Sequence, residues 1–492
     1  MPKMDTVKSL GYRVNNEYLG FTPTSSSTKP PYIANGLFRE VSGTVCNYED
    51  VHEWMSATER KKNNPVSCEY IIEKFNPILW RGDKEDPANI KQFRFLLDDI
   101  FNPDHTVFPE YDFSVLNISS QWLVKDSLKG EGRIGGFIFE ILAKRIQGER
   151  SPAIKLIQEA LTTDTDDFTK IIKPIIVFPS EEAKIEKTQL DYPLDDDIKW
   201  DECKATIRRG FDNLAKNMFA LGESKNSLLV LERMVNFSCF AAFYYLINVN
   251  AVHHGGVASP ILIDAGTDIE SIKRASEHCY SFAKTAVEEY YIASIYAILQ
   301  EEIPQNNRAA CAAWIQQMIF DNNKEKEITE ALNSYFESFC EDGDNAIHAL
   351  AHALQIVLYT FVYKNTSPSD FCRVLGVKVG LIGPRGNAAK AKRYLVNSFT
   401  LETITYSILS TEDIEDGIEL RDFSKKATEI YNILLGADVD TEYSILEKAN
   451  IAQRAPGDLR GDMALNAQRL ADLYIALGLG HRYADGVTMI GG

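Results

Sequence analysis

The longest regular pattern in the sequence is an apolar stripe between residues 268 and 302. Its members recur at steps of three, four or seven residues and are Ile269, Ile272, Ala275, Cys279, Phe282, Ala286 and Ala293. That spacing places them along one side of an α-helix. At 1.5 Å per residue such a helix is roughly 50 Å long, which is enough to frame a domain. The stripe therefore predicts a mainly α protein built around long helices.

Helical periodicity continues on both sides of this stripe. Candidate helices in the middle of the chain are 202–220, 224–250, 307–321, 326–340 and 344–363. A chain of 492 residues exceeds what one hydrophobic core usually serves. We therefore predict a multi-domain helical protein with an irregular, mixed N-terminal region at 1–125, a helical domain at 126–368 and a C-terminal domain at 369–492.

The C-terminal domain carries the clearest local signals. Helices are predicted at 398–409, 420–435 and 462–477, and Gly478 ends the third of them. Asp485-Gly486 then lies between short runs that favour strands, which predicts a β-hairpin. Three helices followed by a hairpin are the layout of a winged-helix-like module.

A run of basic residues precedes these helices in an acidic chain. Residues 373–400 contain six basic residues and no acidic one, whereas the whole chain has a formal net charge of −18. Within this run, Gly383-Pro384-Arg385-Gly386-Asn387 predicts an exposed turn. We expect this basic turn, with the basic residues that follow it, to contact phosphates and the third predicted helix to reach base edges. The candidate nucleic-acid contacts are Arg385, Lys390, Lys392 and Arg393 in the turn, and Asn466, Gln468 and Arg469 on the helix. A protein-binding surface is the equal alternative, because 371–492 contains 14 basic and 16 acidic residues.

Two histidines suggest an alternative chemistry. His348 and His352 lie one turn apart on the predicted helix 344–363, and histidines at that spacing can share a metal ion. A third ligand would have to come from elsewhere in the chain. The alternative function is therefore a metal-dependent hydrolase or nuclease, and the structural alternative is a pair of hydrogen-bonded imidazoles beside an apolar stripe.

Other motifs point away from cofactor chemistry. Residues 130–135 match G-x-G-x-x-G, but the polar residues before them do not predict the strand that a dinucleotide site needs. Asp264 follows a short apolar run, in the way that a strand end presents a carboxylate, and a connector is the expected role. We predict no cofactor.

Location follows from two further features. The eight cysteines contain no C-x-x-C pair, which is typical of reduced thiols. The first residues lack the apolar core of a secretion signal, and the apolar run 235–252 contains asparagines, which indicates a buried helix and not a membrane span. A cytoplasmic protein is predicted.

The run from Pro260 to Ala275, the basic turn and the closing run from Leu473 to Val487 resemble uncharacterised helical subunits encoded in bacterial anti-phage and DNA-modification gene clusters. The resemblance implies a non-catalytic adaptor or DNA-engaging subunit. It also implies partner chains that supply an ATPase, helicase or nuclease. Duplex DNA is the other expected partner of this protein.

Overall fold

A computed structural model describes residues 7–24, 27–42, 44–46, 131–162, 184–186, 200–317, 325–341, 345–363, 367–385, 392–484 and 486–492. Most of the predicted N-terminal region 1–125 lies outside these residues. So do Gly130 of the glycine motif, Lys390 of the basic turn and Asp485 of the predicted hairpin.

The described part is mainly helical, as predicted. The helices of the N-terminal part are α1 (Val7–Arg13), the π-helix η1 (Val14–Leu19), α2 (Pro30–Ser42), α6 (Ile134–Ala143) and α7 (Pro152–Thr162). The middle part contains α9 (Glu202–Ala220), the 3-10 helix η5 (Glu223–Lys225), α10 (Ser227–His254), α11 (Glu270–Glu302), α12 (Arg308–Gln316), α13 (Glu325–Glu341), α14 (Ala346–Val357) and the π-helix η6 (Leu358–Tyr363). The C-terminal part contains α15 (Pro368–Val379), α16 (Ser398–Ile408), α17 (Thr411–Asp416), α18 (Leu420–Tyr431), α19 (Val439–Lys448), the 3-10 helix η7 (Ala452–Arg454) and α20 (Leu459–Ala476).

The strands are short and pair in four small sheets among the described residues. They are β1 (Thr44–Cys46), β2 (Lys184–Glu186), β3 (Ile261–Leu262), β4 (Ile382–Gly383), β5 (Arg393–Tyr394), β6 (Ile418–Glu419), β7 (Ile433–Leu434), β8 (Gly480–Arg482) and β9 (Thr488–Ile490). The pairs β1–β2 and β4–β5 are antiparallel, whereas β3 and β7 pair in parallel. The fourth sheet has the strand order β6-β9-β8 and is antiparallel throughout.

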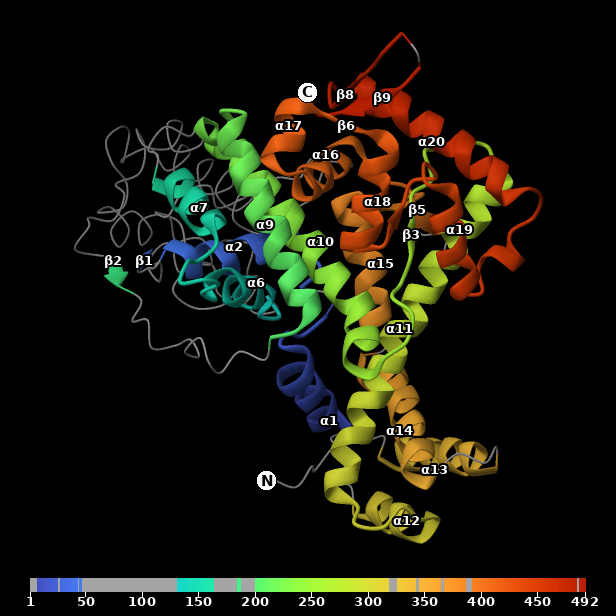
Figure 1. The fold of residues 1–492 in the computed structure, drawn as a ribbon. Coiled ribbons are helices and arrows are strands. Elements are labelled where there is room, and N and C mark those ends of the chain that lie inside the picture. Colours follow the sequence, from blue (N-terminus) through green and yellow to red (C-terminus); the bar gives the residue numbers. More distant parts are fainter. Residues whose placement is uncertain are drawn as a thin grey trace, which may run out of the picture.

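The helix α10 is the centre of the structure. Nearly all of its residues between Val230 and Val249 are buried, on every side of the helix, and α9, α7, α15, α2 and α11 pack around it (Figure 1). Buried apolar side chains from all parts of the described chain form one contiguous cluster with it. Two of its polar residues hydrogen-bond to other segments: Asn236 donates to the hydroxyl of Thr400, and Asn248 accepts the backbone N–H of Ser259.

The predicted 268–302 helix is present as α11 and links two parts of the molecule. Its first turns pack against β3, β5 and α20, and later turns pack against α14. Figure 1 shows α11 running down from the C-terminal part to a lower lobe that contains α12, α13 and α14. We call these three helices the lower lobe. The predicted helices 202–220 and 344–363 are also present, as α9 and as α14 with η6.

The C-terminal part agrees with the predicted helices and hairpin, with one difference. The helix predicted over 420–435 ends at Tyr431, because Asn432 adopts a left-handed conformation with φ of 56° and turns the chain into β7. The helix α19 then precedes α20, and β8 pairs with β9 as predicted.

Two described helices are long and apolar enough to cross a membrane, namely α10 and the continuous stretch Ala346–Tyr363. Inside the protein, 83% of the apolar window of α10 and 50% of the other window are buried. Core helices of a folded protein have the same length and composition, so these two properties do not by themselves indicate a membrane span. The location of the protein stays a prediction.

Close helix packing at Gly210 gives the first testable prediction. A Cβ atom at this position of α9 would overlap the hydroxyl of Tyr431 and the ring of Phe237. We expect Gly210→Ala to lower the free energy of unfolding by about 1–3 kcal/mol, as overpacking does. At Gly136 of α6 the nearest atom would be the Arg133 Cγ at 3.4 Å, an ordinary contact. Gly136→Ala should therefore be neutral or stabilising by up to ~1 kcal/mol.

Thermal and denaturant unfolding, followed by circular dichroism, measures both variants. Equal stability of the two variants would contradict the close approach of Gly210 on α9 to Phe237 and Tyr431.

Candidate nucleic-acid interface

The third predicted helix is present as α20, and its polar residues divide between two sides. Its buried side is formed by Leu459, Met463, Asn466, Ala467, Leu470, Ala471 and Tyr474. Gln468 and Arg469 lie on the outer side and are exposed. Arg469 makes no ion pair with any residue that the structure describes, so its charge remains available to a ligand.

Asn466 points the other way, into the protein. Its side chain has no exposed surface, and its amide donates to the carbonyl of Ile263 at 2.8 Å and to that of Leu435 at 3.4 Å. Its carbonyl oxygen accepts the backbone N–H of Ala265 at 3.0 Å. Asn466 therefore joins α20 to the ends of β3 and β7 in this structure, and a contact with a base would require these bonds to break.

The basic turn lies between β4 and β5. Lys392 is buried and donates to the carbonyl oxygen of Pro384, which joins the two described ends of this segment. Arg385 is half-buried, and Lys390 lies outside the described residues. Their contact with phosphates stays a prediction.

Arg393 forms a buried ion pair at the end of β3. Its Nε lies 2.5 Å from Oδ2 of Asp264, and the two side chains are 14% and 0% exposed. The other oxygen, Oδ1, accepts the backbone N–H groups of Gly266 at 2.9 Å and Thr267 at 3.2 Å. Asp264 is thus fully engaged at the start of the loop that leads into α11. The carboxylate at a strand end that the sequence suggested is present, and it serves to hold Arg393.

These contacts bring the basic turn and α20, the two predicted nucleic-acid contacts, to one place. The basic turn reaches Asp264 through Arg393, and α20 reaches the next residue, Ala265, through Asn466. Residues that are distant in the sequence therefore meet at the carboxyl ends of the parallel strands β3 and β7. We call this meeting point, formed by Asp264, Ala265, Arg393 and Asn466, the strand-end junction.

The charge beside the strand-end junction is mixed. Asp268 is fully exposed, and a hydrogen bond from Lys273 lowers the pKa of its carboxyl group, with a smaller contribution from the charge of Arg393. An ionised carboxylate therefore lies near Arg393 at the surface. This carboxylate repels anions, so the local charge is less favourable to a phosphate than the basic run alone suggests.

The turn after β7 is also held by a buried carboxylate. Glu442 has no exposed surface, and its oxygens accept the backbone N–H groups of Gly436 at 2.6 Å and Asp438 at 3.1 Å, and the hydroxyl of Ser424 at 2.5 Å. Burial raises the pKa of this carboxyl group, although the three donors favour its ionised form. These bonds fix α19 against α18 and β7.

Some exposed residues of this region were not among the predicted contacts. Leu465 is 49% exposed on the outer side of α20, and Tyr483 is 54% exposed beyond β8. Arg482 on β8 pairs with Asp472 of α20 at 2.9 Å, which ties the hairpin to the helix. Helical spacing relative to the buried Met463 and Leu470 could have predicted the exposure of Leu465, whereas nothing local signals Tyr483.

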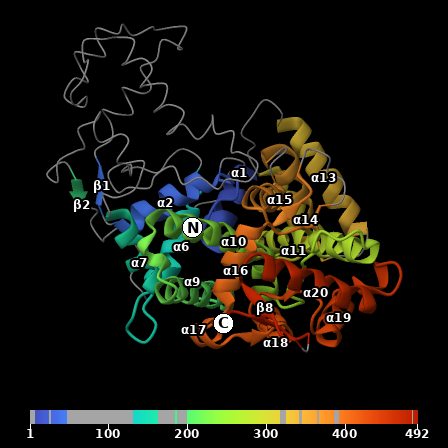
Figure 2. The same ribbon diagram turned by 90° about the horizontal axis from the view of Figure 1, so that it is seen from above.

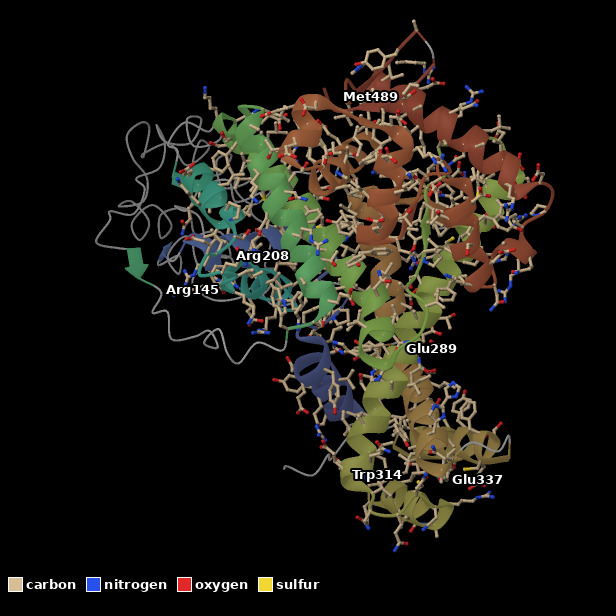
Figure 3. All side chains as sticks on the ribbon, in the orientation of Figure 1. Arg145, Arg208, Glu289, Trp314, Glu337 and Met489 are labelled. Atoms are coloured by element: carbon tan, nitrogen blue, oxygen red, sulfur yellow. The ribbon has the colours of Figure 1, made fainter. Side chains whose placement is uncertain are left out.

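The two histidines lie in the lower lobe on α14 (Figure 3 labels its neighbours Trp314 and Glu337). The ring of His352 stacks on Phe339, with centroids 4.0 Å apart, and the ring of His348 lies 5.9 Å from that of Tyr296. Among the residues that the structure describes, no group of three or more His, Cys, Asp or Glu side chains could hold a metal ion. Asp344 lies outside the described residues, and metal binding by His348 and His352 stays a prediction.

Comparison with known proteins found no matching family model, curated protein or solved structure.

The strand-end junction gives the second prediction. Asp264→Ala leaves the largely buried Arg393 guanidinium without its acceptor and removes the acceptor of the Gly266 and Thr267 backbone N–H groups, so we expect the free energy of unfolding to fall by about 2–4 kcal/mol. Asp268→Ala removes the same chemical group four residues further on, where it is fully exposed, and should leave the unfolding midpoint unchanged. Thermal unfolding of the two variants against the wild type makes the comparison. A small effect of Asp264→Ala would contradict the structural role of the pair.

Proposed function

We propose that this protein is a non-catalytic adaptor subunit of a multi-protein complex that acts on DNA, and that residues 369–492 contain a winged-helix-type module that contacts duplex DNA. The observation that carries the proposal is the outer side of α20, which presents Gln468 and Arg469 beside a three-stranded sheet.

The order of elements supports a winged-helix-type module. The strand β6 comes between α17 and α18 and pairs with the last strand, β9, while α20 leads directly into the β8–β9 hairpin. In helix-turn-helix proteins the second helix of the motif lies in the major groove, with side chains directed at base edges. The corresponding helix here is α20, and the β8–β9 hairpin corresponds to the wing.

The side chains on α20 suit this role. Arginine pairs with guanine through two hydrogen bonds in the major groove, and glutamine pairs in the same way with adenine. Arg469 has no ion-pair partner among the described residues, which leaves its donors available. Arg482 on the hairpin adds a second positive charge, although Asp472 partly neutralises it.

The adaptor part of the proposal rests on the surface and on the resemblance noted from the sequence. Exposed Leu465 and Tyr483 are residues of the kind that protein interfaces bury, and a net charge of −18 favours basic partners. The partner chains would supply the ATPase, helicase or nuclease activity, in the cytoplasm of the cell.

Binding to duplex DNA tests the proposal, and the third prediction is its outcome. We expect the full-length protein to bind a fluorescent DNA duplex, measured by anisotropy at low salt, and Arg469→Gln to weaken that binding by about tenfold, the cost of one lost base contact. Arg308→Gln is the matched control, because it removes the same charge from exposed α12 in the lower lobe (Figure 1).

Equal affinity of Arg469→Gln and Arg308→Gln would reject the role of α20. Absence of any binding by the wild type would reject DNA as the ligand of this module.

A further inference from the structure

A short hairpin joins α6 to α7 and stands out from the surface. Its residues 145–150, with the sequence RIQGER, are all exposed. Figure 2 shows this loop, in teal, projecting beyond α9. With Lys144 at its base we call it the 144–150 hairpin. It contains three basic residues and one acidic residue, in a chain whose net charge is −18.

The tip of the hairpin is a tight turn. Ile146 and Glu149 exchange both backbone hydrogen bonds, at 2.9 and 3.1 Å. Between them Gln147 and Gly148 have φ angles of 54° and 86°, the left-handed region that a two-residue hairpin of this hand requires. Gln147 is not a glycine, so its backbone carries strain that the surrounding contacts must offset.

Those contacts come from one buried arginine on α9. Arg208 is 2% exposed and donates to the carbonyl oxygens of Ile141, Lys144 and Glu149, at 3.3, 2.5 and 3.3 Å (Figure 3 labels Arg208 and Arg145). Its Nε donates to Asp212 at 2.9 Å. Both strands of the hairpin are therefore fixed to α9 through a single guanidinium group.

We call these hydrogen bonds of Arg208 the clamp, and Asp212 extends the clamp to the second strand of the hairpin. The hydroxyl of Ser151, directly after the hairpin, donates to the same carboxylate at 2.5 Å. At the other end, the Lys144 ammonium lies 5.4 Å above the ring of Trp200. The hairpin is thus held at both ends and presents its side chains from a fixed base, which lowers the entropy cost of binding a partner.

The exposed charges at and beside the hairpin are positive, apart from Glu149. Arg145 and Arg150 are exposed on its two strands, and Arg209 and Lys216 are exposed on the neighbouring α9. Arg150, Arg209 and Lys216 form no ion pair with any described residue. Arginine is the side chain best suited to paired hydrogen bonds with phosphate oxygens.

From these observations we infer that the 144–150 hairpin is a second DNA contact, in which Arg145 and Arg150 bind backbone phosphates of duplex DNA. The inference rests on the proposed function, since it names the same ligand, but it concerns a different surface. The major groove admits a two-stranded ribbon of this width, so the turn can sit at a groove edge with an arginine toward each flanking phosphate.

The test, our fourth prediction, measures the salt dependence of DNA binding. For the full-length protein, the slope of log K against log salt concentration should become shallower by about 1 in Arg150→Gln and by about 2 in the double variant Arg145→Gln/Arg150→Gln. Affinity at low salt should fall about tenfold for the double variant. Arg308→Gln should change neither quantity.

A second variant keeps every charge and tests the fixed geometry. Gly148→Ala meets no atom within 4 Å, but alanine disfavours a φ of 86°. We expect the affinity of this variant for duplex DNA to fall about threefold, while the slope of log K against log salt concentration stays unchanged because no charge is lost.

The outcomes separate the two ideas. If the wild type binds DNA and the hairpin variants bind with the same affinity and slope, the hairpin inference is wrong and the role of α20 is untouched. If the hairpin variants lose DNA binding while Arg469→Gln does not, the hairpin inference is supported and the proposed recognition role of α20 is wrong. No binding by the wild type overturns both.

Discussion

The enclosure of α10 is the constraint on which the rest of the structure depends. A helix with apolar side chains on every side is stable in water only when other elements cover all of its faces. Here α9, α7, α2, α15 and α11 divide those faces among them, so elements from the beginning, the middle and the end of the chain share one core. The described segments therefore pack around this one helix and do not form successive separate units along the chain.

Polar contacts decide how the C-terminal elements attach to this core. Apolar packing alone allows neighbouring helices to slide, whereas a buried hydrogen-bond network allows one arrangement. At the strand-end junction, one carboxylate, one guanidinium group and one amide connect β3, β5 and α20. The clamp of Arg208 on the 144–150 hairpin applies the same principle at the surface, where it fixes a loop and not a helix.

Local patterns in the sequence predicted the long helices well, because helical periodicity needs no knowledge of distant residues. They did not predict the side chains that join distant segments. Asn466 was expected to face DNA, although it lies three residues after Met463 and four before Leu470, on the buried stripe of α20. Its partner, the carbonyl of Ile263, is 203 residues away, and no local pattern contains that information. The basic run likewise predicts that Arg393 contacts phosphate, and nothing near it in the sequence reveals its pairing with Asp264, 129 residues away.

The parallel pairing of β3 with β7 has a consequence for how the chain is made. Ile261 pairs with Ile433, so one strand is synthesised long before the other. At translation rates of about 5–20 residues per second, the first strand waits roughly 10–30 s for its partner. During that interval Asp264 has neither Arg393 beside it nor α20 behind it. The strand-end junction therefore forms only after the last fifth of the chain has been synthesised. A truncated mRNA that lacks this part would yield a protein whose central helices are complete but whose strand-end junction cannot form.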